Sequence, residues 1–187
     1  MIFQPLFSSF IATEEINLDN QMLSSICYKE KLKNKNNDKT IYLNLNKKDL
    51  SLFFSTILKK FNEIHNILNL KKNIKQELSL SWCNINNNDY IDSPHFHSDA
   101  FLSAVYYVKA EKNCGDIEFT SPIVSLPYII NNKHIEQYNT CNSYTWKITP
   151  KTGLLIIFPS WLTHFVYKNK SNVDRISIAI NSKPLKN

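Results

Sequence analysis

The chain has 187 residues, of which 43% are hydrophobic and 12% aromatic, enough for one sizeable apolar core. The formal net charge of +6 comes from lysines spread along the whole sequence, so nucleic-acid binding is not expected. The first residues lack a basic start and a cleavage site, and the longest apolar run, Leu154 to Phe158, is far short of the roughly 20 residues that span a bilayer. These features argue against a signal peptide or a membrane span and predict a soluble, cytoplasmic protein.

The cysteines and the overall layout indicate one intracellular domain. Cys27, Cys83, Cys114 and Cys141 have no paired spacing, so we expect reduced thiols. We expect a single domain over residues 1–187, with a mostly helical flank in 1–76 and a β core in 77–187. No repeat or spacing reports the oligomeric state.

The amino-terminal part predicts two helices. A weaker helix is expected from about Asp19 to Lys33, with its buried side formed by Met22, Leu23, Ile26 and Cys27. The stronger pattern runs from Lys48 to Leu70 and should cover a sheet. Its apolar residues recur at three- and four-residue steps: Leu50, Phe53, Phe54, Ile57, Leu58, Phe61, Ile64 and Leu68.

From Glu77 onward the apolar period changes to two, which predicts strands. The expected strands are Glu77 to Ile85, Phe101 to Lys109, Asp116 to Thr120, Ser143 to Ile148, Gly153 to Phe158, Thr163 to Tyr167 and Arg175 to Asn181. The two stretches Asn84 to Asn88 and Tyr128 to Asn142 are expected to be loops over a barrel mouth. The fold class is therefore α+β, mainly β, as a jelly-roll-like sandwich or barrel with helices at its flank.

The segment Ser93 to Asp99 carries the first candidate site. Side chains alternate along an extended strand, so His97 and Asp99 would project to the same side. His164, from a distant strand, is the natural third ligand of a two-histidine, one-carboxylate site. Such a site holds iron and leaves positions open for a chelating cosubstrate and O2.

Arg175 is the only arginine of the chain, and it lies eleven positions after His164. A guanidinium binds a carboxylate through two parallel hydrogen bonds. Ser177 lies on the same face of the predicted strand, so the two residues together would bind the far carboxylate of an organic acid. The alternative is that Arg175 is only an ion-pair partner of Asp174 or Asp116.

This arrangement resembles the 2-oxoglutarate (2OG) and Fe(II)-dependent dioxygenases, and most closely a 2OG-Fe(II) oxygenase family of marine phages and bacteria. The resemblance covers nearly the whole chain. It is carried by Ser81-Trp82-x-Asn84, His95-x-His97, Leu102-Ser-Ala-Val-Tyr-Tyr-Val108, Phe158-Pro-Ser-Trp-Leu-Thr-His164 and Arg175-Ile-Ser-Ile-Ala-Ile-Asn181.

The resemblance implies a double-stranded β-helix, also called a jelly-roll or cupin-like fold. It implies that His97, Asp99 and His164 hold Fe(II) and that Arg175 and Ser177 bind the 5-carboxylate of 2OG. Tyr107 matches a strand tyrosine that helps to bind 2OG in prolyl-hydroxylase-like members, although a packing role for this residue is an equal alternative.

The chain departs from the resembling branch at position 99, which in that branch is often not acidic. His95 and His97 would then be ligands together with His164, in a three-histidine site. We expect Asp99 to be the ligand, because a carboxylate is the hard anionic ligand usual in this chemistry. Asp99 and His95 therefore stand as alternative third ligands.

Among the remaining residues, His65 and Trp161 are expected to pack and His134 to be solvated. The sequence thus predicts a 2OG- and Fe(II)-dependent dioxygenase. It would hydroxylate a C–H bond of an unidentified substrate, with a protein or peptide side chain a plausible one, and release succinate and CO2. The competing interpretations are a jelly-roll binding module without catalysis and a three-histidine dioxygenase that uses no 2OG.

Overall fold

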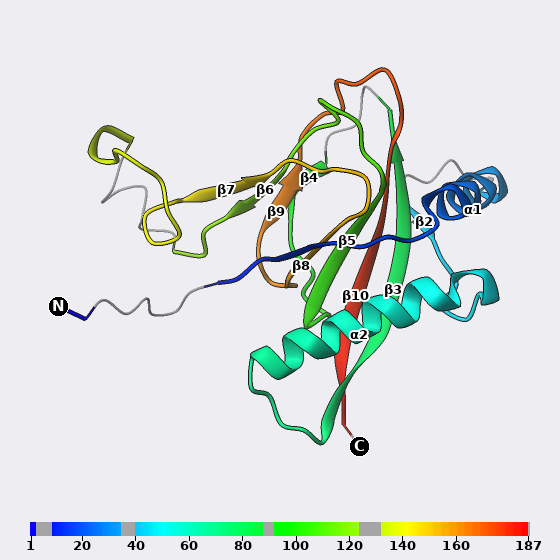
Figure 1. Ribbon diagram of the computed structural model, residues 1–187, viewed down its shortest axis with the longest axis horizontal. Helices are drawn as coiled ribbons and strands as arrows, with labels where there is room; N and C mark the ends of the chain where they lie inside the picture. Colours follow the sequence, from blue (N-terminus) through cyan, green and yellow to red (C-terminus); the bar gives the residue numbers. More distant parts are fainter. Residues whose placement is uncertain (3–8, 35–39, 88–91, 124–131, 187) are drawn as a thin grey trace.

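Two antiparallel sheets form the body of the computed structural model, which describes residues 1–2, 9–34, 40–87, 92–123 and 132–186 (Figure 1). The larger sheet has the strand order β1-β8-β5-β10-β3-β2 and the smaller one the order β4-β9-β6-β7. The larger sheet comprises β1 (Ala12–Glu15), β2 (Ile41–Tyr42), β3 (Ile74–Asn86), β5 (Leu102–Lys109), β8 (Leu154–Pro159) and β10 (Arg175–Lys186). The smaller comprises β4 (Asp92–His95), β6 (Ile117–Thr120), β7 (Thr145–Ile148) and β9 (His164–Val166).

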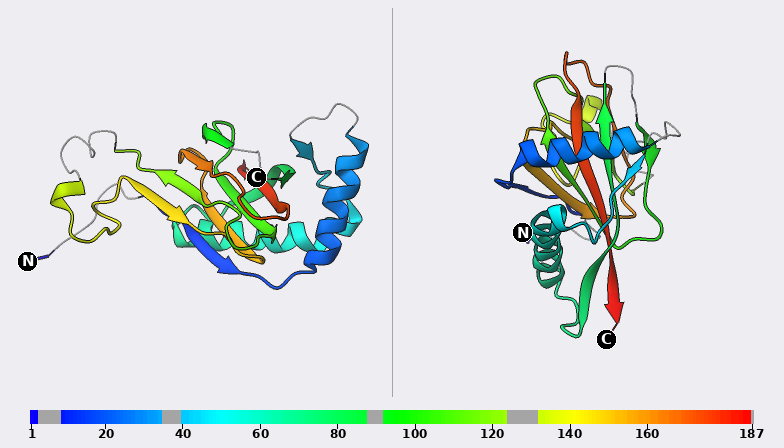
Figure 2. Two further views of the ribbon diagram at one scale, coloured as in Figure 1. Left: turned by 90° about the horizontal axis from the view of Figure 1, so that it is seen from above. Right: turned by 90° about the vertical axis from the view of Figure 1, so that its right-hand side faces the viewer.

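The helices lie outside the sandwich. They are α1 (Asn20–Lys33), α2 (Ser51–Ile67), and the short 3-10 helices η1 (Lys48–Leu50) and η2 (Asn132–His134). Helix α2 runs along the larger sheet, and α1 packs against β5, β3 and β2 of the same sheet (Figures 1 and 2). Within the described residues, no helix combines the length and the apolar character needed to cross a membrane.

Strand alternation divides the core into two layers. On β10, Ile176, Ile178 and Ile180 face the helices and join the larger apolar cluster. The intervening residues of the strand face the smaller sheet instead, because side chains of a strand alternate between its two faces. A second cluster fills the space between the sheets, built around Ile117, Phe119, Leu154, Ile156, Phe158 and Leu162. The inner face of β10 is therefore the face available to a site.

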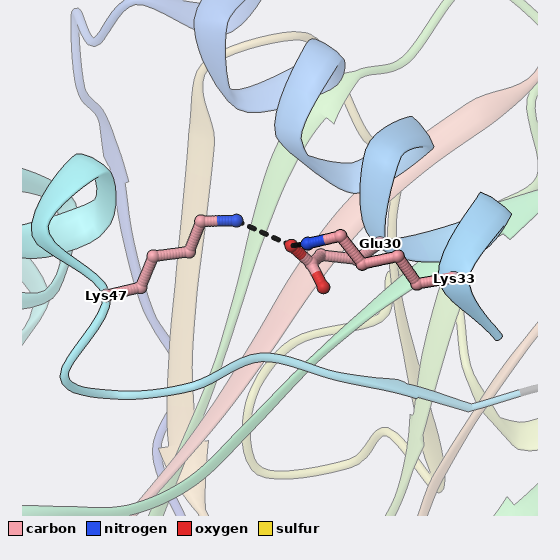
Figure 3. Close-up of polar contacts among 3 residues, drawn as sticks. All are labelled: Glu30, Lys33 and Lys47. Atoms are coloured by element: carbon pink, nitrogen blue, oxygen red, sulfur yellow. Dashed lines mark hydrogen bonds and ion pairs between the residues drawn. The ribbon is translucent and has the colours of Figure 1, made fainter.

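Helix α1 begins with a capping hydrogen bond, and near its other end Glu30 forms two ion pairs. The Asp19 side chain accepts a hydrogen bond from the Met22 amide at 2.8 Å, which satisfies a donor of the first turn. Glu30 Oε1 lies 2.9 Å from Lys33 Nζ and 2.5 Å from Lys47 Nζ (Figure 3). The hydrogen bond from Lys47, followed by that from Lys33, lowers the pKa of Glu30. The contact ties α1 to the segment that precedes η1.

Both expected helices and all seven expected strands are present, with shifted ends. Two residues expected on buried helix faces are exposed, Met22 at 37% and Leu68 at 36%, because each lies at the edge of its apolar stripe or past its helix end. The expected loop Asn84 to Asn88 is wrong up to Asn86, because β3 continues to that residue along β10. Residues 88–91 and 128–131 lie outside the described residues. The rest of the second expected loop, 132–142, contains η2 and turns and no strand. The short strands β1, β2 and β4 were not predicted as strands.

Candidate metal centre and its cavity

Three histidines converge at one end of the smaller sheet. His95 ends β4 and His164 begins β9, and the two residues are directly paired in the antiparallel register. His97 follows two positions after His95, and its amide donates a hydrogen bond to the Ser160 carbonyl at 2.8 Å. One ring nitrogen from each of the three imidazoles lies within 4.8 Å of those of the other two. A single ion can be reached from all three at this spacing, so the donor set fits a metal.

Backbone carbonyls select the nitrogen that each of two histidines presents. His164 Nδ1 donates to the Leu162 carbonyl at 2.9 Å, and His95 Nδ1 donates to the Ser93 carbonyl at 2.7 Å. A carbonyl can only accept, so the Nδ1 atoms carry the protons and the Nε2 atoms keep free lone pairs. This is the outer-shell contact that orients metal-binding imidazoles in proteins.

Burial favours the neutral form of His164 and of His97. It lowers the pKa of His164 to about 3, with the neighbouring His95 and His97 acting in the same direction. The pKa of His97 is also lowered, first by burial and then by His95. Only the unprotonated imidazole can donate a lone pair to a metal, so the site is prepared for binding at neutral pH. Phe119 and Phe158 flank His164, with ring centroids 6.0 and 4.7 Å from the imidazole.

Asp99 lies in an exposed turn two residues after His97 and is not part of the histidine cluster. Its charge acts on His97 by raising the pKa, so the carboxylate is near that imidazole without joining the group. Strand β4 ends at His95 and a turn occupies Ser98 and Asp99, so the strand alternation that underlay the pairing of His97 with Asp99 is absent. His95, the alternative ligand, is in the cluster.

The histidines open onto a cavity between the sheets. Its far wall is the inner face of the larger sheet, where the four β10 residues Arg175, Ser177, Ala179 and Asn181 line it in sequence. The neighbouring strands contribute to the same wall, because Tyr107 of β5 and Asn84 of β3 are both in register with Ser177. Each predicted cosubstrate residue therefore lines the same cavity as the histidines.

Arg175 is 1% exposed and is fixed by main-chain carbonyls. Its Nη1 donates to Cys114 O at 2.6 Å, Tyr167 O at 3.2 Å and Gly115 O at 3.3 Å. Within the described residues the guanidinium forms no ion pair, and Asp174 instead accepts a hydrogen bond from the Tyr28 hydroxyl at 2.8 Å. The predicted alternative of a structural ion pair with Asp174 is therefore wrong. The hydrogen bonds of Arg175 to the described residues use Nη1 alone, and Arg175 also lines the cavity.

The tyrosine pair separates as the strand predicts. Tyr106 is fully buried on the helix side and donates to Asn20 Oδ1 at 2.8 Å. Tyr107 is 1% exposed and lines the cavity, and burial raises its pKa, with the Arg175 charge acting in the opposite direction. Its hydroxyl is a neutral donor at physiological pH.

Several cavity residues lie in the segments that carry the family resemblance but were assigned no role from the sequence. Among them are Trp82, Ser103, Phe158 and Asn181. Trp82 lies edge-on to His97 at a centroid distance of 5.5 Å. Period-two alternation from Arg175 identifies Asn181 once the face of Arg175 is known. Trp161, expected to pack, is 52% exposed, whereas His65 is buried as expected and His134 is exposed as expected.

Comparison with known proteins identifies the family and the fold. The model of the family described as Putative 2OG-Fe(II) oxygenase matches residues 80–181, more than half of the chain. No curated protein sequence is similar enough to count as a relative.

Among solved structures, a Pseudomonas putida prolyl-4-hydroxylase is similar at a TM-score of 0.62 and 11% identity, over 92% of this chain and 91% of that chain. The 2OG complex of a viral collagen prolyl hydroxylase from Paramecium Bursaria Chlorella virus-1 matches at 0.57 and 15%, over 92% and 94%. Iron-bound HygX from Streptomyces hygroscopicus matches at 0.54 and 10%, over 95% and 83%. These likenesses confirm the predicted fold, the double-stranded β-helix.

Proposed function

Because the chain belongs to this family of 2OG-Fe(II) oxygenases, we propose that His95, His97 and His164 hold its Fe(II) and that Arg175, Ser177 and Tyr107 bind its 2OG. The family establishes a 2OG-dependent oxygenase that uses iron. The assignment of ligands is supported by the three imidazole nitrogens, which all lie within 4.8 Å of one another. The set with Asp99 in place of His95 stays the sequence-based alternative.

Bound Fe(II) would supply the redox centre for the reaction of O2 and 2OG with a substrate C–H bond, which yields succinate, CO2 and an alcohol. The protein orients the reactants. Arg175 presents Nη2 and Nε to the 5-carboxylate, since Nη1 is held by main-chain carbonyls. Ser177 and Tyr107 add hydroxyl donors, and Phe119 and Phe158 exclude water beside His164.

An anaerobic titration tests the ligand set. Fe(II)-loaded protein is titrated with 2OG while the weak visible charge-transfer band of the chelate is followed. We expect the band in the wild-type protein and in Asp99→Ala, and we expect its loss in His95→Ala. His134→Ala, which removes an exposed histidine outside the cluster, is the matched control. Loss of the band in Asp99→Ala with retention in His95→Ala would establish the alternative set instead.

We further propose a protein or peptide side chain as the substrate. Two neighbouring structures are named as prolyl hydroxylases. Phe96, between His95 and His97 in the chain, is 57% exposed, and Trp161, three residues before His164, is 52% exposed. Aromatic side chains of this kind contribute contact area to peptide binding. Succinate release in the presence of proline-containing peptides tests the substrate class, and release only with small metabolites would contradict it.

The cellular context is also part of the proposal. We place the protein in the cytoplasm, of the host if the gene is phage-borne, as one domain over residues 1–187. The four free cysteines support the location. The packing of α1 and α2 on the sheet that lines the cavity supports a single domain. Fractionation of the producing cell, with detection of the full-length chain, checks the location.

A further inference from the structure

Asn181 has a polar atom turned into the cavity without a protein partner. The residue is 3% exposed and lies on the inner face of β10, three alternate positions beyond Arg175. Its Oδ1 accepts a hydrogen bond from Ser103 Oγ at 2.8 Å. Its Nδ2 donates to no described residue. Nδ2 is also not among the described polar atoms that are fully buried without a partner, so this atom retains accessible surface. The amide nitrogen therefore opens onto the cavity.

A buried hydrogen-bonded chain holds this amide at a set position relative to the histidines. Ser103 Oγ lies 2.9 Å from Ser160 Oγ, and the Ser160 carbonyl accepts from the His97 amide at 2.8 Å. Ser103 and Ser160 are 2% and 0% exposed. Buried hydrogen bonds of this kind restrict the side chains that make them to one arrangement. Asn181 is thus oriented by the same segment that positions His97.

The order of residues on the β10 face places Asn181 beyond the metal site as seen from Arg175. Trp82, whose ring lies edge-on to His97, is in register with Ala179. Arg175 and Ser177 lie on one side of that row and Asn181 on the other. An acid whose far carboxylate is bound at Arg175 extends along this face towards the histidines and brings its keto-acid end to the side of Asn181.

We propose that Asn181 is a further cosubstrate-binding residue, whose Nδ2 donates a hydrogen bond to the keto-acid end of 2OG. This inference rests on the proposed function, because it assumes 2OG bound between Arg175 and the histidines. An amide donor facing a carboxylate makes a charge-assisted hydrogen bond. The hydrogen bond from Ser103 to Oδ1 fixes the orientation of the amide, so that Nδ2 is directed away from Ser103. Arg175 then binds one end of the diacid and Asn181 the other.

Two variants at position 181 separate the donor from the packing of the residue. Asn181→Asp keeps the shape and the oxygen that accepts from Ser103, but it puts a negative charge in place of the donor. Asn181→Ala removes both. We expect Asn181→Ala to weaken 2OG binding about tenfold and Asn181→Asp to weaken it further, because two carboxylates repel. A purely structural role would instead be rescued by the shape-conserving Asp.

Two acids locate the contact on the cosubstrate. Anaerobic titrations of the Fe(II)-loaded protein use 2OG and 2-oxopentanoate, which keeps the keto-acid end but lacks the second carboxylate. We expect the Asn181 variants to weaken both acids. Arg175→Ala is expected to weaken only 2OG. Thermal unfolding of each variant, followed by circular dichroism, reports whether the fold is intact.

The outcomes distinguish the two levels of the proposal. Folded Asn181 variants that bind both acids like the wild-type protein would overturn the inference and reassign the amide to the primary substrate. Loss of 2OG binding alone, with 2-oxopentanoate unaffected, would overturn it as well. Absence of binding of either acid to the wild-type protein would overturn the proposed function, and this inference with it.

Discussion

At the scale of single residues, burial decides the chemistry of the histidine cluster. His164 is 5% exposed and pairs through Nδ1 with a backbone carbonyl, whereas Asp99, in an exposed turn, remains in contact with water. A buried imidazole is costly to protonate and stays neutral, as a metal ligand must. The neutral His164 imidazole can therefore bind a metal, but its burial lowers the stability of the metal-free protein in acid.

The pH dependence of stability follows from this. The ordinary pKa of 6.5 applies to His164 in the unfolded chain, and burial lowers it to about 3 in the folded chain. Between these values the unfolded chain binds the extra proton, so stability is present above pH 6.5 and is lost as the pH falls towards 3. Urea unfolding of the metal-free protein should show this decline, and His164→Asn should show a shallower one. Equal slopes in the two proteins would contradict the assignment.

At the scale of elements, the turn before β6 builds the seat of Arg175. Gly115 has φ of +91°, and a Cβ placed there would lie 2.2 Å from Tyr167 O and 2.9 Å from Arg175 Nη1. Those atoms are the guanidinium and one of the carbonyls that fix it. Glycine is required here both for its positive φ and for this close approach.

Gly115→Ala should therefore impair 2OG binding as well as stability, because the added methyl displaces the guanidinium. Gly153→Ala is the matched control: its φ is +85°, but the added Cβ would meet only Ile16 O at 3.2 Å. We expect both variants to lose stability and only Gly115→Ala to lose 2OG affinity by about tenfold or more. Titration with 2OG after Fe(II) loading measures the difference. Equal 2OG affinity in the two variants would rule out this role for the turn.

Helix α2 is the element that seals the outer face of the larger sheet. Phe61 is fully buried in its apolar stripe, whereas Leu52 on the opposite face is 68% exposed. Phe61→Ala should lower the free energy of unfolding by about 3–5 kcal/mol, because it leaves a cavity in the core. Leu52→Ala should change it by about 0.5 kcal/mol or less. Urea unfolding gives both values, and a similar cost for the two would show that the stripe does not face the sheet.

At the scale of the whole molecule, the two sheets supply different halves of the site. The proposed metal ligands belong to β4, β9 and the segment after β4, whereas Arg175, Ser177 and Tyr107 belong to the larger sheet. Arg175 already crosses the gap, since its Nη1 bonds to carbonyls that precede β6 and follow β9. Metal and 2OG together would connect the sheets a second time.

Binding of both ligands should then stabilise the protein more than the two separate effects combined. Mn(II) replaces Fe(II) to avoid oxidation, and thermal unfolding is followed with the metal, with 2OG, and with both. A ligand at a hundredfold excess over its Kd contributes about 2.7 kcal/mol, or roughly 5–10 °C in Tm at this chain length. Arg175→Ala should abolish the excess but retain the effect of Mn(II). Simple additivity in the wild-type protein would contradict the bridging.

The sequence by itself determined the strand periods, the helices, the family and the cavity residues around Arg175, because alternation and motif spacing are local properties of the chain. It favoured Asp99 as the third ligand with His95 as the alternative, and only the pairing of β4 with β9 gathers His95 with the other histidines. Asn181 and Trp82 likewise became part of the cavity through cross-strand register. Register between distant strands depends on packing across the whole sandwich, and for that reason tertiary structure decided where these side chains meet.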